Sequence, residues 1–217
     1  MRKPVPRPSS PGTAPVALGR RRVAQQDRSV ETQRRLLAAT ARCLVDSGYA
    51  RLTTAAIARE AQVSEGALFR HYPTKADLIV AAIEQVFADL ESRYRRSIER
   101  AGKKDDVAAA SVEALWKVMT TPEYLMTNEV YLAARSDGAL GAALRPMALR
   151  HQANLLRRAR ELYGANAPPH FDDAFDVLIL AMQAAAIDSV ALQDKRTDRR
   201  RLAAFDALAR LALKQTR

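Results

Sequence analysis

Ser64 and His71 are the first pair of side chains in this sequence that suggests chemistry, because a serine and a histidine can act as nucleophile and general base. They lie seven residues apart. On one helix that separation is about two turns, or roughly 10 Å, which is too far for the hydrogen bond that such a pair requires. The stretch VSEGALFRHYPTKADLI, Val63 to Ile79, therefore favours a binding role over a catalytic one.

The other candidate residues give no support to an enzyme or a metal site. The three histidines, His71, His151 and His170, include no His-x-x-x-His pair. The sequence also has neither a cysteine cluster nor a glycine-rich phosphate loop. We therefore predict no catalytic residues, no metal ligands and no cofactor.

The charge of the chain indicates a polyanionic partner. The sequence has 35 Lys and Arg against 24 Asp and Glu, a formal net charge of +11. DNA, RNA and an anionic membrane surface are the candidates. A basic surface that only keeps the protein in solution is the simpler alternative, since net charge concerns association and not fold.

Hydropathy and cysteine content indicate the cellular compartment in which the protein is found. No run of about 18 apolar residues predicts a membrane-spanning helix, and the basic N-terminus lacks the apolar segment of a secretory signal. The single cysteine, Cys43, cannot form an intrachain disulfide, which fits a reducing compartment. The hydrophobic share of 48% is enough for a sizeable core. The sequence thus predicts a globular cytoplasmic protein that does not enter a membrane.

Residues 1–28 differ in composition from the rest of the chain. They hold five prolines in the first fifteen positions and seven basic residues against one aspartate, 7 − 1 = +6. A segment with so little apolar periodicity cannot bury enough surface to offset its ordering entropy. We predict a disordered basic arm, which either reaches the DNA backbone or a minor groove or is a solvated tail.

From Ser29 onward the apolar residues repeat at steps of three and four, which is typical of amphipathic helices. A first helix of about 18 residues is expected to end at Gly48, and a long helix is expected from Thr74, after Pro73, to about Ala101. No stretch alternates as a strand does, so the predicted fold class is all-α. Later helices are predicted over residues 107–119, 122–135, 140–163, 171–194 and 197–215.

Two short helical segments, LTTAAIAREA and EGALFRHY, lie between the first helix and the long one. Thr53 or Thr54 can cap the first of them, and Ser64 can cap the second. Two short helices joined by a tight turn and packed on a longer helix make a helix-turn-helix, here over about residues 52–71. The apolar positions spaced to form its small core are Ile57, Ala58, Ala61, Val63 and Leu68.

The full stretch TTAAIAREAQVSEGALFRHYPTKADLI closely resembles the DNA-binding domain of the tetracycline-repressor (TetR) family. The shared features are the Thr-Thr start, the Val-Ser turn, the Gly-x-Leu-aromatic core, the His-aromatic close and the lysine two residues after the proline. The resemblance covers residues 29–89 and implies a three-helix DNA-binding domain there. Over residues 90–217 the chain is similar to the family only in length, helix content and order, which implies a helical domain for effector binding and dimerisation.

Carried over position by position, the resemblance implies contacts to double-stranded DNA by Thr54, Ser64, Glu65, Gly66, Ala67, Arg70, His71 and Lys75. Arg70 is the best candidate for a bidentate guanine contact, whereas Ala67 offers only a methyl group to thymine. Glu65 either accepts from cytosine or repels the backbone in wrong registers. Phe69 stands where the family commonly has a tyrosine. We expect Leu68 and Phe69 to be core residues, with Tyr72 packed on the first helix.

The last two predicted helices suit a homodimer contact, and the resemblance implies the same. Their broad apolar stripes are rich in small residues, as a four-helix interface requires. The alternative is that these stripes cover the core of the monomer. The stripe positions are Phe175, Leu178, Ile179, Met182, Ala185, Ala186, Ser189 and Val190, followed by Leu202, Phe205, Leu208, Ala209 and Ala212.

The middle of the chain has a composition that suits an adaptable apolar pocket for a small effector. Glu129, His151 or Gln183 would orient a mainly hydrophobic ligand. Such residues are more often simply core. The predicted lining residues are Trp116, Met119, Tyr124, Glu129, Tyr131, Met147, His151 and Gln183.

The sequence therefore predicts a DNA-binding transcriptional regulator, specifically a dimeric repressor that a small hydrophobic effector releases from an inverted-repeat operator. The effector would act by preferring a conformation whose recognition helices are wrongly spaced. The main alternative is an architectural protein that binds DNA of any sequence through its basic face.

Overall fold

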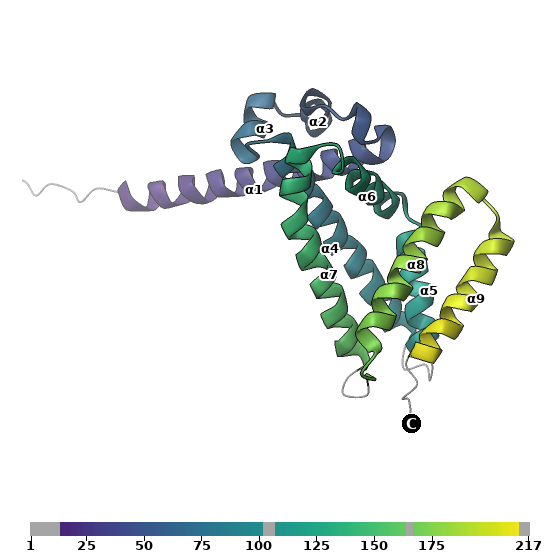
Figure 1. Ribbon diagram of the computed structural model, residues 1–217. Helices are drawn as coiled ribbons and strands as arrows, with labels where there is room; N and C mark the ends of the chain where they lie inside the picture. The colour runs from purple at the N-terminus through teal and green to yellow at the C-terminus, as the bar shows by residue number, and fades with distance from the viewer. Residues whose placement is uncertain (1–13, 102–106, 164–166, 213–217) are drawn as a thin grey trace, which may run out of the picture.

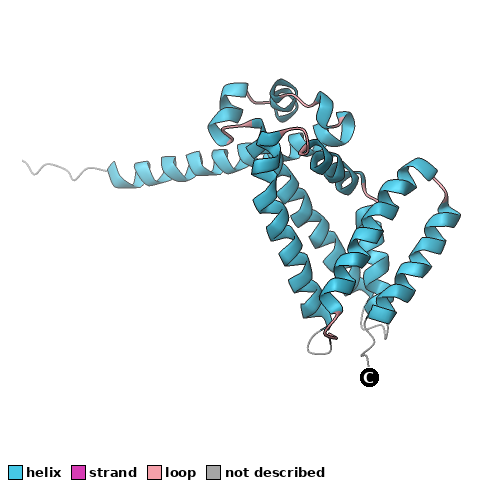
Figure 2. Cartoon of the chain, in the orientation of Figure 1, coloured by secondary structure: helices cyan, strands magenta, loops and turns pink. Residues whose placement is uncertain are grey.

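The computed structural model describes residues 14–101, 107–163 and 167–212 (Figure 1). Helices joined by loops make up these residues, and no strand occurs among them (Figure 2). The prediction of an all-α fold is confirmed. The elements are α1 (Ala14–Ser47), η1 (Tyr49–Arg51), α2 (Thr54–Ala61), α3 (Glu65–His71), α4 (Lys75–Ala101), α5 (Val107–Met119), α6 (Pro122–Ala133), α7 (Gly138–Tyr163), α8 (Phe171–Leu192) and α9 (Lys195–Ala212).

The first helix starts earlier than the sequence predicts. α1 begins at Ala14 and not at Ser29, and its N-terminal part extends away from the other helices in Figure 1. The prediction of a disordered arm is therefore wrong for residues 14–28, and residues 1–13 lie outside the described residues. The physical reason is that adding turns to an existing helix is far easier than nucleating one. Arginine and glutamine, which recur in this segment, also favour helix.

Threonine caps fix the starts of α2 and α4. The Thr53 hydroxyl accepts a hydrogen bond from the amide of Ala56 at 3.1 Å, so Thr53 is the N-cap of α2. The Thr74 hydroxyl accepts from the amide of Asp77 at 3.0 Å, and the Asp77 carboxylate accepts from the amide of Thr74 at 3.1 Å. This reciprocal pair satisfies two amides that have no partner within the helix. Of the two predicted candidates, Thr53 and not Thr54 caps α2. The predicted start of the long helix after Pro73 is confirmed.

The helices are arranged around α4. In Figure 1, α2 and α3 lie across α1 at one end of the molecule, and α4 leads away from them beside α7. α4 contacts α1, α5, α6 and α7, whereas α9 contacts α5 and α8. One hydrophobic core extends from Leu36 and Ile57 through Ile83 to Val130 and Met182. The boundary predicted at residue 89 falls inside α4, so one continuous helix crosses the predicted domain boundary.

α8 differs from the sequence prediction in its hydropathy. It is the one helix in the described residues whose length and composition would allow it to cross a membrane, with a mean hydropathy of 1.7 over its most apolar window. Such a helix is weak support for a membrane span, since apolar helices of soluble proteins have the same property. Only 22% of that window is buried, so α8 has a large apolar surface that the described residues leave uncovered.

Candidate DNA-binding surface and effector cavity

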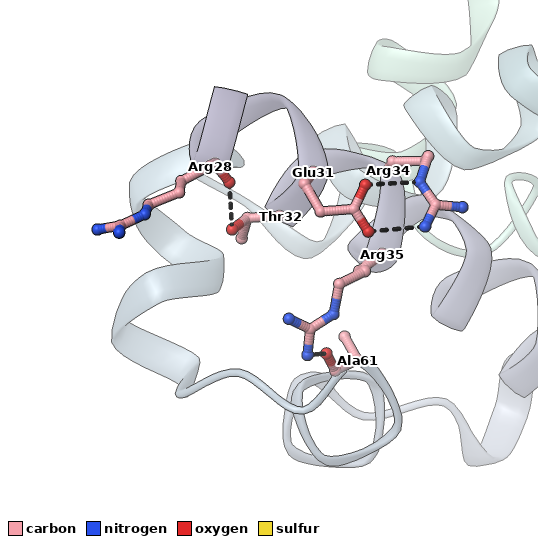
Figure 3. Close-up of polar contacts among 6 residues, drawn as sticks. All are labelled: Arg28, Glu31, Thr32, Arg34, Arg35 and Ala61. Carbon is pink, nitrogen blue, oxygen red and sulfur yellow. Dashed lines mark hydrogen bonds and ion pairs between the residues drawn. The ribbon is translucent and has the colours of Figure 1, made fainter. Parts of the chain in front are cut away.

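The turn between α2 and α3 is held by a residue of α1. Gln62 ends α2 in the left-handed conformation with φ 54°. The Arg35 guanidinium reaches across from α1 and donates to the carbonyl oxygen of Ala61 (Figure 3). It also donates to the carbonyl oxygen of Gln62 at 2.9 Å. These carbonyls lie at the end of a helix, where they lack intrahelical partners. Arg35 therefore ties the position of the turn to α1, a role that was not predicted from the sequence.

Figure 3 also shows polar contacts along α1 itself. The Glu31 carboxylate and the Arg34 guanidinium form an exposed ion pair at 2.7 Å, and the Thr32 hydroxyl donates to the Arg28 carbonyl at 2.8 Å. The hydrogen bond from Arg34 is the main cause that lowers the pKa of Glu31. Exposed pairs of this kind contribute little to stability. Arg35 differs from them because its partners belong to another helix.

α3 presents a polar, solvent-exposed face opposite its buried one. The Ser64 hydroxyl accepts from the amide of Ala67 at 3.1 Å, which confirms Ser64 as the N-cap. Leu68 is fully buried against the other helices, whereas Glu65 and Arg70 are exposed. A Cβ built on Gly66 would meet no atom within 4 Å, so the backbone there is open to close approach by a large partner.

Phe69 lies on the exposed face of α3. Its side chain is 44% exposed, so the prediction that it belongs to the core is wrong. Adjacent residues of a helix point about 100° apart, and Leu68 takes the inward direction. Tyr72 packs against the core, and burial raises its pKa.

Several side chains predicted to contact DNA also interact within the protein. The Thr54 hydroxyl donates to the Glu65 carboxylate at 2.8 Å, which joins the starts of α2 and α3. The ammonium of Lys75 lies 4.9 Å from the centre of the Tyr49 ring, a cation–π geometry. The Arg70 guanidinium donates to the carbonyl of Gly66 at 3.3 Å. The half-buried His71 closes α3. These contacts restrict polar side chains at the starts of α2 and α4 and along α3.

A polar junction connects this surface to α6. The Glu129 carboxylate accepts a hydrogen bond from the backbone amide of Tyr49 at 2.8 Å, and the Tyr49 hydroxyl donates to Asp137 at 2.5 Å. Burial, followed by the bond to Asp137, raises the pKa of Tyr49 to about 12. Gly48 has φ 73° and a Cβ there would lie 2.7 Å from the Glu129 carboxylate, so glycine is required. Glu129, predicted as an effector contact, lies in this junction.

A cavity of about 130 Å³ lies between α4, α5, α6, α7, α8 and α9. Met119, Tyr124 and His151, all predicted effector contacts, line it. The His151 ring stacks on Phe87 with ring centres 3.7 Å apart, and burial lowers its pKa to about 4. The Tyr124 hydroxyl accepts from the side-chain amide of Gln183 at 2.6 Å, and burial raises the Tyr124 pKa to about 12.

The other predicted effector contacts lie outside the cavity lining. Trp116 packs 6.2 Å from the ring of Phe205, and Met147 is buried in the core. Tyr131 is 39% exposed. Gln183 reaches the cavity only through Tyr124. The lining also contains polar residues that were not predicted from the sequence, namely Ser111, Glu91 and Arg158. The Arg158 guanidinium forms an ion pair with the Glu91 carboxylate.

α8 and α9 form an apolar outer surface. Several of the predicted dimer positions, among them Ile179, Met182 and Phe205, are instead buried in the core of this chain. The exposed apolar residues lie on the opposite sides of the same helices. They are Val177, Leu180, Ile187, Val190 and Leu192 on α8, with Leu208 and Leu211 on α9. We refer to these seven residues as the outer α8–α9 face.

Comparison with known proteins establishes the family. The family model described as "Bacterial regulatory proteins, tetR family" matches residues 36–82, which include α2 and α3. A helix-turn-helix transcriptional regulator of Mycobacterium tuberculosis is 30% identical over 158 residues, which cover 73% of this chain and 80% of that protein. This chain belongs to the TetR family. It is therefore a DNA-binding transcriptional regulator, as its relatives are.

Two further comparisons extend the match. The regulator CymR of Pseudomonas putida is 30% identical to this TetR-family chain over 120 residues, which cover 55% of this chain and 59% of CymR. A solved structure of a TetR-family regulator from Rhodococcus sp. superposes with a TM-score of 0.68 over 85% of this chain and all of that one, at 14% identity. The fold is thus shared along most of the chain even where the sequence has diverged. The relatives named here are regulators and not enzymes.

Proposed function

We propose that this TetR-family protein is a homodimeric repressor that binds an inverted-repeat operator through α3 and releases it when a small hydrophobic effector occupies the cavity. The observation that carries the proposal is the exposed face of α3, where Glu65, Gly66 and Arg70 lie together on a helix anchored by its cap and by Leu68. A rigidly held helix with such a face suits the major groove.

In this proposal Arg70 reads a guanine and Ala67 contacts a thymine methyl group. The exposed ring of Phe69 adds an apolar contact to a base or sugar in place of a hydroxyl contact to phosphate. Thr54, His71 and Lys75 bind phosphates and so set the docking position. The bond between Thr54 and Glu65 supports a positioning role for Glu65, since it fixes the carboxylate before DNA arrives.

Residues 29–89 form the DNA-binding domain in this proposal, and residues 1–28 bind additional phosphates. The basic N-terminal part of α1 extends beyond the rest of the structure, which supports such binding (Figure 1). Deleting residues 1–25 should then reduce the dependence of DNA affinity on salt by about 0.9 logarithmic units for each phosphate that the segment neutralises. An unchanged slope would leave the segment as a solvated tail.

Residues 90–217 carry dimerisation and effector binding in this proposal. The residues of the outer α8–α9 face are large, apolar and exposed, and a second copy of this face would bury them around a two-fold axis. Recognition helices related by that axis would read half-sites about one DNA turn, roughly 34 Å, apart. The protein would act in the cytoplasm, where the DNA lies.

Two helices support coupling between the cavity and α3. α4 begins at Lys75 in the DNA-binding domain and lines the cavity at Phe87. α6 lines the cavity at Tyr124 and bonds to the DNA-binding domain at Glu129, only five residues further along. A ligand that displaces Tyr124 would therefore shift Glu129 and the junction to Tyr49. Its effect on the free energy of DNA binding cannot exceed the difference between its own binding free energies for the two conformations.

Selection of bound sites from a pool of random duplex DNA tests this proposal. Enrichment of an inverted repeat, together with a dimer in sedimentation, is the expected result. Enrichment of no sequence at all, with a steep salt dependence, would instead make the protein an architectural DNA binder.

A further inference from the structure

The cavity contains a buried hydroxyl that has no hydrogen-bond partner among the described residues. Ser111 is only 5% exposed, lines the cavity, and its Oγ atom makes no hydrogen bond there. A buried hydroxyl without a partner is unfavourable, and a ligand atom that pairs with it forms a hydrogen bond without breaking another one within the protein. Ser111 is therefore a polar anchor that an otherwise apolar cavity offers to a ligand.

The side chains that line the cavity carry no net charge. The only oppositely charged side chains among them, Glu91 and Arg158, form an ion pair with each other. The Nε atom of Arg158 is buried without a hydrogen-bond partner among the described residues. Burial lowers the pKa of His151 to about 4 and raises that of Tyr124 to about 12, so both are neutral at pH 7. An ionised ligand would introduce an uncompensated charge into an apolar space.

The size of the cavity restricts the ligand further. A volume of about 130 Å³ is close to the roughly 150 Å³ of an engineered apolar cavity that binds benzene. Phe87, Leu115, Phe175 and Ile179 supply apolar walls. A molecule about as large as one six-membered ring fits without rearrangement of the helices.

We propose that the effector is a neutral, largely apolar molecule the size of a single ring, with one hydroxyl or carbonyl group that hydrogen-bonds to Ser111. The inference rests on the proposed function, because it takes the cavity to be the effector site. Ser111 would then determine specificity, since a ligand without the polar group would leave its hydroxyl unpaired.

Ligand-observed NMR titrations of the full-length protein with benzene, phenol and benzoate test this assignment. Phenol should bind about three- to tenfold more tightly than benzene because of one hydrogen bond. Benzoate should bind most weakly because it is ionised. Tightest binding by benzoate, or no binding by any of the three, would overturn the assignment.

Ser111→Ala provides the decisive variant. It should abolish the preference for phenol over benzene. The affinity for benzene should stay unchanged, and this unchanged affinity would show that the cavity of the variant is intact. Ser136→Ala, which removes an exposed hydroxyl outside the cavity, should keep the preference. A preference that survives in Ser111→Ala would contradict the assignment.

Operator affinity, measured with and without saturating phenol, separates this inference from the proposed function. Ser111-dependent phenol binding that leaves operator affinity unchanged would support the ligand chemistry assigned to the cavity and contradict its effector role. Release of the operator by another ligand, with no phenol binding, would overturn the inference and leave the proposed function standing.

Discussion

The proposed DNA-binding surface and the cavity are assembled over very different distances along the chain. The surface is formed between Thr54 and Lys75, by two short helices and the turn that joins them. The cavity is lined from Phe87 to Ala212, by residues of six helices. The first depends on caps and one tight turn, and the second on how long helices pack.

This difference determines what each region leaves open to a partner. On the DNA-binding surface, Thr54, Glu65 and Lys75 already have partners in the protein, so the surface is preorganised. In the cavity, Ser111 and the Nε atom of Arg158 lack partners among the described residues. We infer that DNA meets a surface that is already set, whereas the effector completes a site.

The compact origin of the DNA-binding surface makes it sensitive to a single core substitution. Leu68→Ala should lower the free energy of unfolding by about 2–5 kcal/mol, because Leu68 is fully buried under a short helix. Urea denaturation measures this. Leu132→Ala, at a residue that is 71% exposed, should change stability by less than about 0.5 kcal/mol. Equal destabilisation of the two variants would contradict the role of Leu68 in the core.

Arg70→Ala should weaken binding to the selected operator by about 1–3 kcal/mol and relax the preference at one base step in each half-site. Equilibrium titrations on the operator and on single-base variants measure both effects. Arg96→Ala, which removes an exposed arginine far along α4, should change neither. Lys75→Ala should weaken all sequences alike and lower the salt slope by about one unit. Uniform weakening in Arg70→Ala would make Arg70 a phosphate contact.

His151, which lines the cavity, should make the stability of the protein depend on pH. The unfolded chain protonates His151 near its ordinary value of 6.5, but burial lowers the pKa in the folded protein to about 4. The free energy of unfolding should therefore fall as the pH drops from about 6.5 to about 4, by on the order of 1 kcal/mol after allowance for partial exposure. Above that window His151 contributes no pH dependence. His151→Gln should flatten this part of the profile, and an unchanged slope would contradict the buried, neutral histidine.

The junction between the two regions should carry a smaller effect. Glu129→Ala removes the acceptor of the Tyr49 amide, and it should reduce the effector response by about two- to fivefold, or roughly 0.5–1 kcal/mol of coupling. Glu129→Gln keeps an acceptor oxygen and should restore most of the response. Glu123, on the same helix as Glu129, forms an exposed ion pair with Arg93 of α4. Glu123→Ala removes this pair and serves as the control. Coupling that all three variants leave intact would exclude the junction.

Sequence alone was informative where the structure is local. The caps Thr53, Ser64 and Thr74 were predictable because each depends on residues only three positions away. The direction of Phe69 was not, since it depends on which side of a short helix faces α1. The helical start of α1 at Ala14 could not be predicted from composition. The proline content and charge of this segment indicate disorder, but an existing helix extends easily into it.

The cavity could be predicted only in part. Met119, Tyr124 and His151 have the composition of a pocket and do line it. Ser111 could not be recognised as a cavity residue from the sequence. A serine within an alanine-rich helix usually points to solvent or hydrogen-bonds to a backbone carbonyl of the preceding turn. The predicted dimer stripes of α8 and α9 were likewise separated by the packing. Val190 and Leu208 are exposed, whereas Ile179, Met182 and Phe205 are buried. Because much of each helix is apolar, only packing determines which of these positions is covered.

Operator affinity measured with the full chain, with and without a ligand shown by NMR to occupy the cavity, tests the central claim that the two regions are coupled. We predict that saturating ligand weakens operator binding by about 5- to 150-fold, the usual range for coupling between sites. An operator affinity that stays the same when the cavity is fully occupied would contradict this coupling.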